Sequence, residues 1–463
     1  MEVVAPDRVD VLVAGGGNAG CCAVLSAHER GASTLLVEHG NEQARGGNSK
    51  YTRNLRCASD VYPEEEVLRD LISVTGNEID LDLAKSVIRA SREAPAWMAG
   101  YGVRWQPAFR GTINLDRTNH FFLGGGKALL NVYYRALEER AVPVLYQTRV
   151  TAIDTDATGG FVVTLERGTE TKHVRTRAFV AASGGYESNI EWLEREWGAA
   201  ARQFIIRGTA SNDGAVLQML FDRGAQARGN PRGFHSIAVD ARSPRYDGGI
   251  VTRVDSIPHG IVVNRRAQRF YDEGEMIWPK RYASWGRLIA EQDGQIAYSI
   301  FDAKTRGNFV PACFPPIEAP AIAELADALG LERDALIRTV SDYNAHTTDG
   351  TFDMSRLDGL ATRDLTPPKS NWARTIDAAP FYAYPVRPGI TFTYLGVKVD
   401  AQARVIGCDG QAMPGIFAAG EVMAGNLLTQ GYLAGFGMTI GTVVGRIAGR
   451  EAAMHATPSA AAR

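Results

Sequence analysis

The stretch Val9–Glu38 constrains the fold of this chain more than any other part of the sequence. Val9–Ala14 is a short apolar run rich in β-branched residues, which is typical of a strand buried on both faces. Three glycines follow at the spacing G-x-G-x-x-G: Gly15, Gly17 and Gly20. A helix of small residues is expected next and ends at Gly31, and Ser33–Val37 is predicted to form a second strand. This order predicts an α/β fold.

Each part of this stretch suits a dinucleotide. Gly15 allows the tight turn, Gly17 lets backbone N–H groups approach a pyrophosphate, and Gly20 lets the helix pack closely on the strand. The positive end of the helix dipole then faces the phosphates. Glu38, about 20 residues beyond the turn, is placed to accept a hydrogen bond from a ribose hydroxyl. The stretch predicts a dinucleotide site, and the alternative is a glycine-rich turn without a ligand.

Length and charge exclude several classes of protein. The 463 residues are enough for two domains with substantial cores. Lys and Arg number 50 and Asp and Glu number 52, which gives a net charge of −2. Bulk charge therefore indicates neither a nucleic-acid partner nor a membrane surface.

Cysteine usage and the N-terminus favour a cytoplasmic location. The 5 cysteines are odd in number and form no C-x-x-C pair, which argues against a disulfide framework and against a zinc or iron–sulfur site. We therefore expect no metal site. The N-terminus has no basic segment followed by an apolar one, and no run reaches the ~18 apolar residues of a membrane span.

A polar, glycine-rich loop, His39–Ser49, follows the second strand at the edge of the sheet where ligands bind in open α/β folds. Within it, Gly46-Gly47-Asn48-Ser49 offers backbone donors to a phosphate or forms a surface turn. Arg53 and Arg56 come soon after and either serve an anion or are solvated.

Hydrophobic periodicity predicts further elements along the chain. Helices are expected at 63–76, 80–100, 128–139 and 330–343. Strands are expected at 142–146, 149–155, 161–166, 173–179, 179–185 and 415–421, with a hairpin over 396–400 and 404–405. A glycine-rich stretch at 431–441 opens a final helix, and the alanine-rich tail from 451 is expected to fray.

The texture of the sequence changes twice. From about Pro231 to about Val386 it is richer in Arg, Asp, Pro and aromatic residues, and afterwards it returns to the earlier composition. We interpret the middle part as a second domain inserted into the first.

The ordered set of motifs is distinctive. It comprises the first glycine turn with its acid, a Gly-Gly-Asn-Ser loop, an Ala-Ala-Ser-Gly-Gly strand, and a late Ala-Ala-Gly-Glu before a glycine-rich helix. Along essentially the whole chain this set resembles the succinate dehydrogenase and fumarate reductase flavoprotein superfamily. It is most similar to the tricarballylate dehydrogenase branch. The stretches that carry this similarity are 45–49, 51–56, 122–127, 249–253, 390–396 and 431–437.

The resemblance implies a Rossmann-like FAD-binding domain formed by 1–230 and 387–463, with an inserted α+β capping domain over 231–386. It implies FAD as the cofactor. Superfamily members with covalent flavin carry a histidine just after the glycine-rich loop, where this chain has Ser49-Lys50-Tyr51. We therefore expect non-covalent FAD.

The resemblance also assigns contacts to FAD. The first glycine turn and Glu38 would hold the ADP half, and Val150 would contact adenine through its backbone. Glu421 would bind the ribityl or phosphate region, and Leu433 with the start of the last helix would face the pyrimidine edge. The expected FAD-binding residues are Gly15, Gly17, Asn18, Ala19, Gly20, Glu38, His39, Gly46, Gly47, Asn48, Ser49, Val150, Ser183, Gly184, Gly420, Glu421, Leu433 and Ala434.

An arginine that follows an Arg-Phe-x-Asn-Glu motif shuttles the proton in fumarate reductases, and Arg269–Glu273 resembles that motif here. Arg281 follows at a longer interval. A guanidinium holds its proton strongly, so such a role needs carboxylates that relay the proton, and Asp272, Glu273 and Glu275 are available. The alternative is that Arg281 is a structural ion-pair partner.

Two departures from fumarate reductases concern the substrate. Their His-His-Thr-x-Gly-Gly stretch is Thr391–Gly396 here, and their carboxylate-binding arginine before the last helix is Tyr432. A carboxylate would need other anchors, and the candidates, which also suit surface or interdomain charges, are Arg253, Arg387 and His235. Tyr394 and Tyr432 resemble the phenols of ketosteroid dehydrogenases, although tyrosines in a core more often pack.

We expect an FAD-dependent dehydrogenase that oxidises tricarballylate, or a similar small di- or tricarboxylate, to an aconitate-like alkene. A base would take a proton α to a carboxylate while hydride moves to flavin N5. The alternatives are a ketosteroid-dehydrogenase-like desaturase of a ketone, a fumarate-reductase-type reductase, and a flavin- or nucleotide-binding regulatory protein without turnover. By resemblance, electrons would leave to a separate membrane iron–sulfur protein, which would associate a cytoplasmic chain with the membrane.

Overall fold

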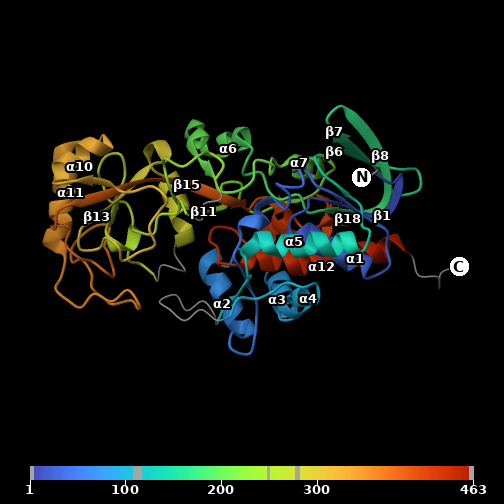
Figure 1. The fold of residues 1–463 in the computed structure, drawn as a ribbon, viewed down its shortest axis with the longest axis horizontal. Helices are drawn as coiled ribbons and strands as arrows, with labels where there is room; N and C mark the ends of the chain where they lie inside the picture. Colours follow the sequence, from blue (N-terminus) through green and yellow to red (C-terminus); the bar gives the residue numbers. More distant parts are fainter. Residues whose placement is uncertain (1–4, 108–116, 248–250, 277–281, 458–463) are drawn as a thin grey trace. The chain divides into compact units, whose positions relative to one another are not determined.

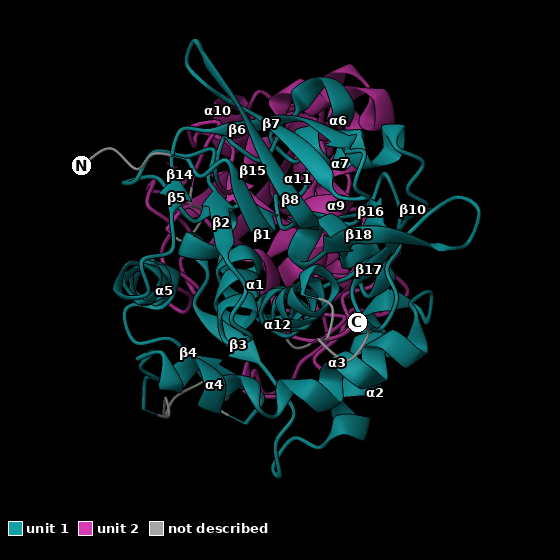
Figure 2. Cartoon of the chain, turned by 90° about the vertical axis from the view of Figure 1, so that its right-hand side faces the viewer, with its two compact units in different colours: residues 1–192, 209–234, 392–463 teal, residues 193–208, 235–391 magenta. Residues whose placement is uncertain are grey.

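The computed structural model describes residues 5–107, 117–247, 251–276 and 282–457, and the chain forms two compact units. The first unit comprises residues 1–192, 209–234 and 392–463, and the second comprises residues 193–208 and 235–391 (Figure 2). The predicted bounds 1–230, 231–386 and 387–463 remain our proposal for the domain organisation.

The first unit is built on a sheet whose central strands run parallel, in the order β17-β18-β8-β1-β2-β5 (Figure 2), and β6 and β7 are attached through β8, as the right-hand part of Figure 1 shows. Its strands are β1 (Arg8–Ala14), β2 (Thr34–Val37), β5 (Val144–Leu145), β6 (Arg149–Thr155), β7 (Phe161–Arg167), β8 (Glu170–Ala181), β17 (Arg404–Ile406) and β18 (Ala412–Ala418). The pairs β18–β8, β8–β1, β1–β2 and β2–β5 are parallel, so these strands end at one edge. The strands predicted at 149–155 and 161–166 are confirmed.

Two helices pack together against this sheet. α1 (Asn18–His28) follows the first glycine turn, and α12 (Phe436–Ala456) is the final helix; the two lie side by side in Figure 2. The remaining elements of this unit are η1 (Gly47–Tyr51), β3 (Asn54–Arg56), α2 (Glu64–Thr75), α3 (Leu81–Ser91), α4 (Ala94–Gly100), β4 (Asn119–Phe121), α5 (Gly125–Glu139), α7 (Ala215–Asp222), β10 (Ala227–Arg228), β16 (Gly396–Val397) and η6 (Gly420–Asn426). Thus α1 is placed by its direct connection to β1, and α12 by packing against α1.

The second unit is a mixed α+β structure around a sheet in the order β11-β15-β13-β12, with β14 and β9 also paired to β15. Its strands are β9 (Ile205–Ile206), β11 (Phe234–Asp240), β12 (Ile261–Val263), β13 (Ala297–Asp302), β14 (Ile317–Ala319) and β15 (Phe381–Thr393). Its helices are α9 (Trp285–Ala290), α10 (Ile322–Leu329) and α11 (Arg333–His346). The chain passes from the first unit to the second within α6 (Ile190–Trp197). Aliphatic side chains from α10, α11 and the sheet form one core, and Trp285, Phe301 and Tyr382 join another. The predicted α/β class with a second α+β part is confirmed.

Besides the strands predicted at 173–179 and 179–185, where the structure has the single strand β8, three predictions about elements are wrong in part. The single helix predicted at 80–100 is divided into α3 and α4, because Pro95 in the first turn of α4 has no N–H to continue the preceding helix. The hairpin predicted over 396–405 is reduced to an isolated bridge between Val399 and Val405; β16 pairs with β10, and β17 pairs with β18. The tail predicted to fray from 451 continues α12 to Ala456, where three alanine side chains are buried.

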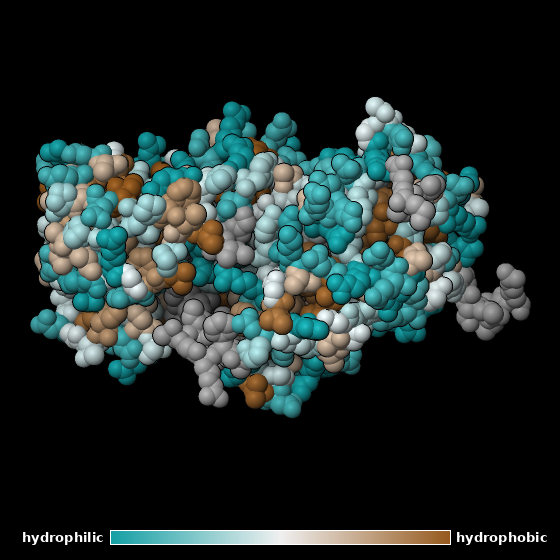
Figure 3. Space-filling model, viewed as in Figure 1, coloured by the Kyte–Doolittle hydropathy of each residue, from teal (hydrophilic) through white to brown (hydrophobic). Residues whose placement is uncertain are grey.

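Hydrophilic side chains cover most of the face seen in Figure 3, and the apolar ones are scattered. Among residues 5–107, 117–247, 251–276 and 282–457, no helix is long and apolar enough to cross a membrane.

Candidate functional site

The first helix and the last helix present their N-termini at the same edge of the sheet. A methyl group placed on Gly441 would lie 2.8 Å from Asn18 Nδ2, one on Gly445 2.5 Å from Ala19 O, and one on Gly449 2.0 Å from Ala23 O. Residue numbers rise together along both helices, so α1 and α12 run parallel. Since α1 starts at the end of β1, both positive helix ends face the carboxyl edge of the strands.

The three glycines of the first turn differ in what surrounds them. Gly15 has φ +106°, and a Cβ there would lie 2.3 Å from Ala182 O; a Cβ on Gly20 would lie 1.8 Å from Gly15 O. Internal packing therefore requires both of these glycines. A Cβ on Gly17 would meet only Ser49 Oγ at 3.4 Å and a carbonyl oxygen at 3.7 Å. Packing leaves room at Gly17, which fits the close approach of a pyrophosphate.

Glu38 is a buried carboxylate at the end of β2, where the sequence predicts a ribose contact. Its Oε1 accepts from Gly40 N at 2.6 Å, and its Oε2 accepts from Gly16 N and Gly46 N, both at 3.2 Å. Three N–H groups fix its position. A carboxylate offers about four acceptor sites, so capacity for a further hydroxyl donor remains.

The glycine-rich loop connects the start of α1 to the interior of the unit. Gly46 and Gly47 have φ values of +97° and +53°, which favour glycine, and lead into η1. Ser49 Oγ accepts from Asn18 N at 3.0 Å, at the first turn of α1. The Asn48 amide is oriented by Thr209 N, which donates to its Oδ1 at 2.8 Å.

Two glutamates come together at the end of this loop. Asn48 Nδ2 and Asn212 Nδ2 each donate to Glu187 Oε1 at 2.6 Å. Glu421 Oε1 accepts from Thr393 N at 2.7 Å and from Thr393 Oγ1 at 3.1 Å. The two carboxyl groups are hydrogen-bonded to each other, and both residues are buried.

The desolvated pair cannot carry two charges. Burial raises the pKa of Glu187 to about 7. Burial, and then the neighbouring Glu187 carboxylate, raise the pKa of Glu421 well above its usual value. Glu187 Oε1 accepts two amide donors that favour its ionised form, so the shared proton resides on Glu421.

The other predicted FAD-binding residues lie around this edge of the first unit. Ser183 and Gly184 follow β8, and Gly420 opens η6 with a φ of +81°, where a Cβ would lie 2.8 Å from Ala19 Cβ. Val150 lies in β6 opposite Leu165, and His39 Nε2 lies 3.2 Å from Arg149 Nη1.

The segment before α12 is fixed by two side-chain donors that bind one carbonyl oxygen. Ala434 O accepts from Asn119 Nδ2 at 2.7 Å and from Arg56 Nε at 3.0 Å, which gives Arg56 a local structural contact. Leu433 is buried beside it. Together these contacts hold the first turn of α12 in place.

The two tyrosines occupy different environments. Tyr394 is fully buried, and its hydroxyl donates to Gly431 O at 2.7 Å, so it positions the segment that carries Tyr432. Tyr432 is half-buried, and its hydroxyl accepts from Gly437 N at 3.1 Å in the first turn of α12. Its hydroxyl thus lies at the helix terminus, and the centroids of the Tyr432 and Phe392 rings are 6.2 Å apart.

Two of the predicted substrate residues of the second unit, Arg253 and Arg387, form hydrogen bonds or ion pairs within the protein. Arg253 forms a forked ion pair with Asp255 Oδ2 at 2.7 and 3.0 Å. Arg387 Nη1 donates to the carbonyls of Gly294 and Gln295 at 2.9 and 3.2 Å. Arg281 lies outside the described residues.

His235 is buried in the second unit beside a cation that sequence reasoning missed. Burial, and then the charge of Arg207, hold the pKa of His235 well below its usual value, so the imidazole is neutral near pH 7. Arg207 is half-buried and donates to Thr391 Oγ1 at 3.0 Å. The Tyr282 ring lies between this group and Arg253, 6.4 Å from His235 and 5.2 Å from the guanidinium.

The motif at Arg269–Glu273 forms a buried ion pair. Arg269 Nη2 and Nε donate to Glu273 at 2.5 and 3.1 Å, and the side chains are 4% and 0% exposed. Glu273 also accepts from Val262 N at 2.8 Å, and Asp272 accepts from Gly274 N at 2.8 Å. The Glu273 and Asp272 carboxylates therefore accept hydrogen bonds that hold this part of the second unit together.

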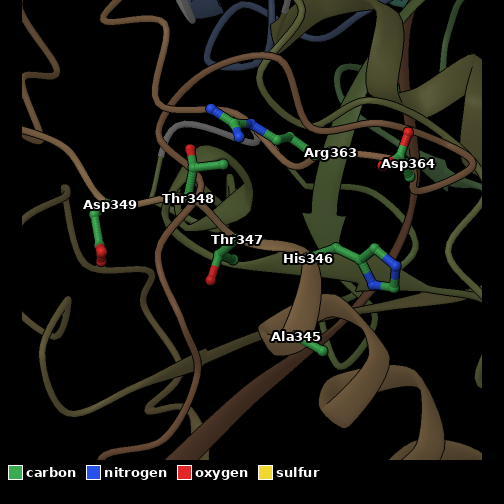
Figure 4. A pocket seen from close by; sticks show the side chains of 7 residues that line it. All are labelled: Ala345, His346, Thr347, Thr348, Asp349, Arg363 and Asp364. Atoms are coloured by element: carbon green, nitrogen blue, oxygen red, sulfur yellow. The ribbon is translucent and has the colours of Figure 1, made fainter.

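A separate depression lies at the C-terminal end of α11 in the second unit (Figure 4). It is lined by polar groups that include His346, Thr347, Thr348 and Arg363. His346 Nδ1 lies 2.7 Å from Asp342 O, and Asp349 and Asp364 also line the depression (Figure 4). None of the predicted site residues lines it.

Sequence reasoning missed Glu187, Asn212 and Arg207. Glu187 follows a strand that ends in paired glycines, which is a position where polar residues reach a ligand edge, and this signal was available. Arg207 and Asn212 come from a segment without a strong pattern, and only the fold brings them to their partners.

Comparisons with known proteins identify the family and the fold of this chain. The sequence model of the family described as "FAD binding domain" matches residues 10–437. The chain is 27% identical over 440 residues to fumarate reductase (cytochrome) of Shewanella frigidimarina, covering 90% of this chain and 72% of that protein. It is 26% identical over 475 residues to vinyl phenol reductase of Lactiplantibacillus plantarum, covering 92% of each. The solved structure of 3-ketosteroid-delta4-(5alpha)-dehydrogenase from Rhodococcus jostii RHA1 superposes with a TM-score of 0.74 at 22% identity, covering 96% of this chain and 97% of that one.

Proposed function

Because this chain belongs to the FAD-binding domain family and is an FAD-dependent oxidoreductase, we propose that it acts on a carbon–carbon bond beside a carboxylate. The substrate class we propose is a small di- or tricarboxylate of the tricarballylate type, oxidised to the alkene. When bound, FAD supplies the ring that accepts hydride. The fumarate named for one relative is itself an alkene flanked by carboxylates.

The observation that supports a carboxylate substrate is the basic cluster of the second unit. Arg207, beside neutral His235 and Thr391, is a half-buried cation whose charge is felt at the imidazole. A guanidinium recognises a carboxylate through charge-assisted hydrogen bonds, and it stabilises the charge that develops when the α-proton leaves. We assign anion binding to Arg207, with Arg253, His235 and Arg387 as supporting residues, and we keep Arg281 as the proposed proton acceptor.

The residues of the first unit hold the coenzyme in this proposal. The N-termini of α1 and α12 face the phosphates and the flavin, Gly17 leaves space for the pyrophosphate, and Glu38 takes the ribose. FAD is bound non-covalently, since Ser49-Lys50-Tyr51 contains no histidine at the position used by covalent members. Electrons leave to a separate acceptor, for which we propose an iron–sulfur protein.

A ketone substrate is the second candidate, and Tyr432 favours it. Its hydroxyl lies at the first turn of α12, where a phenol hydrogen-bonded to a backbone N–H is suited to polarise a carbonyl. A solved structure of similar fold is a 3-ketosteroid dehydrogenase, although a likeness at 22% identity supports the fold alone.

An anaerobic screen of flavin reduction distinguishes the candidates. We expect tricarballylate or a related acid to bleach the flavin absorbance, and a cyclic ketone to leave it unchanged. The opposite result would replace the acid by the ketone. Reoxidation of chemically reduced enzyme by aconitate and by fumarate tests the reductase direction.

Arg207→Met tests the anion site. Loss of a charge-assisted hydrogen bond costs about 1.5–3 kcal/mol, so the half-saturating acid concentration should rise about 10- to 100-fold while the flavin spectrum is retained. Arg338→Met, an exposed arginine of α11, is the matched control and should leave it unchanged. Equal behaviour of the two variants would remove Arg207 from the site.

A further inference from the structure

Glu421, which we expect to bind the ribityl or phosphate region of FAD, forms a carboxyl pair with Glu187, and the function proposed so far gives no role to the shared proton of this pair. Both carboxyl groups lie in the first unit, where the strands β8 and β18 reach the carboxyl edge of the sheet. Asn48 joins this pair to the loop whose next residue, Ser49, contacts the first turn of α1. The pair therefore lies within the framework of the coenzyme site, and the dielectric around it is low.

The donors around the pair are matched to one negative charge. Two amide groups donate to Glu187 Oε1, the backbone N–H of Glu187 adds a further hydrogen bond to this carboxylate, and Thr393 donates twice to Glu421 Oε1. Glu187 Oε2 is buried and receives no N–H or hydroxyl donor among the described residues, so a protonated Glu421 is the group that can donate to this carboxylate. One proton shared between two carboxyls satisfies this arrangement.

Among the residues that the structure describes, no cationic side chain forms a hydrogen bond or an ion pair with either carboxyl group. The groups that face it are the neutral side chains of Asn48, Asn212 and Thr393. The adjacent charged residues are engaged elsewhere: Lys50 Nζ donates to Ala44 O at 2.9 Å, and Asp213 pairs with Arg149. An added negative charge nearby therefore acts on the pair with little screening.

We propose that Glu187 and Glu421 share one proton in the oxidised enzyme and take up a second proton from solvent when two electrons reach the bound FAD. The electrons come from the reductant and remain on the coenzyme, and the pair changes only in charge, from −1 to 0. Added negative charge at the coenzyme favours this uptake, because Glu187 is poised to titrate near neutral pH. The inference holds for any substrate, since it requires FAD alone.

The midpoint potential of the FAD-loaded enzyme, measured against pH by spectroelectrochemistry, tests this proposal. One extra proton per two electrons adds about 30 mV per pH unit, since a tenfold change in proton concentration corresponds to about 30 mV for a two-electron couple. Around pH 7 the wild-type slope should exceed that of Glu187→Gln by this amount, whereas Glu421→Gln, whose amide replaces the protonated carboxyl, leaves Glu187 able to take up the proton and should keep the wild-type slope. Glu166→Gln, on the exposed face of β7, is the control and should retain the wild-type slope.

The two variants also differ in a way that a structural role would not produce. Glu187→Gln leaves a neutral pair, because the remaining desolvated carboxyl stays protonated beside an amide. Glu421→Gln leaves a negative charge on Glu187, which accepts from three amide groups and can still take up a proton, as in the wild type. The potential at pH 7 should therefore be higher in Glu187→Gln than in Glu421→Gln. Equal slopes in all four proteins, or equal potentials in the two variants, would overturn the proposal.

Infrared difference spectroscopy of the wild-type enzyme gives a second test that needs no variant. Reduction should increase the protonated-carboxyl C=O band, and the band should shift in D₂O. Absence of any carboxyl change would overturn the proposal even if a variant failed to retain FAD.

Discussion

The substitutions Gly17→Ala and Gly20→Ala distinguish a glycine needed for ligand binding from a glycine needed for packing in the same turn. A Cβ on Gly17 would meet Ser49 Oγ at 3.4 Å, which is ordinary contact, and the φ of −72° suits alanine. Gly17→Ala should therefore leave the apoprotein unchanged or stabilise it by up to about 1 kcal/mol through the unfolded chain. A Cβ on Gly20 would lie 1.8 Å from Gly15 O, a backbone atom that cannot move aside cheaply. Gly20→Ala should cost about 1–3 kcal/mol or more.

Gly17→Ala, which should not destabilise the apoprotein, should weaken FAD binding. The Gly17 methyl occupies the space through which the pyrophosphate reaches the N–H groups of α1, and each charge-assisted hydrogen bond lost costs about 1.5–3 kcal/mol. The dissociation constant of FAD should rise about 10- to 100-fold in Gly17→Ala.

Thermal unfolding of the apoprotein and a fluorescence titration with FAD measure the two effects. The reasoning is refuted if Gly17→Ala lowers the unfolding temperature as much as Gly20→Ala does, or if Gly17→Ala binds FAD as tightly as the wild type.

Three further predictions concern stability. Glu273→Gln breaks a buried ion pair with Arg269 and should cost about 3–5 kcal/mol in urea unfolding; a loss under 1 kcal/mol would contradict the burial of the pair. Tyr394→Phe leaves the Gly431 carbonyl without its donor and should cost about 1–3 kcal/mol with an unaltered flavin spectrum, whereas a spectral change would indicate a direct role at the flavin. Burial, and then two nearby cations, lower the pKa of His259 to about 4, so the free energy of unfolding should fall as pH falls from about 6.5 to 4, because the unfolded chain binds a proton that the folded imidazole refuses. His259→Phe should flatten that slope, and an unchanged slope would exclude this histidine as its source.

Local sequence pattern was sufficient to predict the first strands and the glycine turn of the nucleotide-binding part of the fold. The apolar run at β1, the glycine turn and the acid at the end of β2 are contiguous, and each constrains its neighbour sterically. The hydrophobic pattern of the sequence predicts a strand less reliably where that strand passes from a half-exposed to a fully buried environment. β8 was predicted as two strands, because its first half alternates between exposed and buried residues while its second half is buried throughout.

The remaining site depends on tertiary contacts that spacing does not reveal. Glu187 and Glu421 are separated by more than two hundred residues, and only the parallel pairing of β8 and β18 brings their loops together. Tyr394 and Tyr432 are indistinguishable in the sequence, yet one hydroxyl is committed to a carbonyl and the other lies at a helix terminus. Arg253 was selected for its charge, and its ion pair with Asp255, two residues away, became evident only from the fold.

Titration of the apoprotein with FAD, followed by acid precipitation, tests the central claim most directly. The account predicts saturation at one FAD per chain and recovery of the flavin in the supernatant, as expected for a non-covalent coenzyme held by the N-termini of α1 and α12. A folded apoprotein that binds no FAD would contradict it.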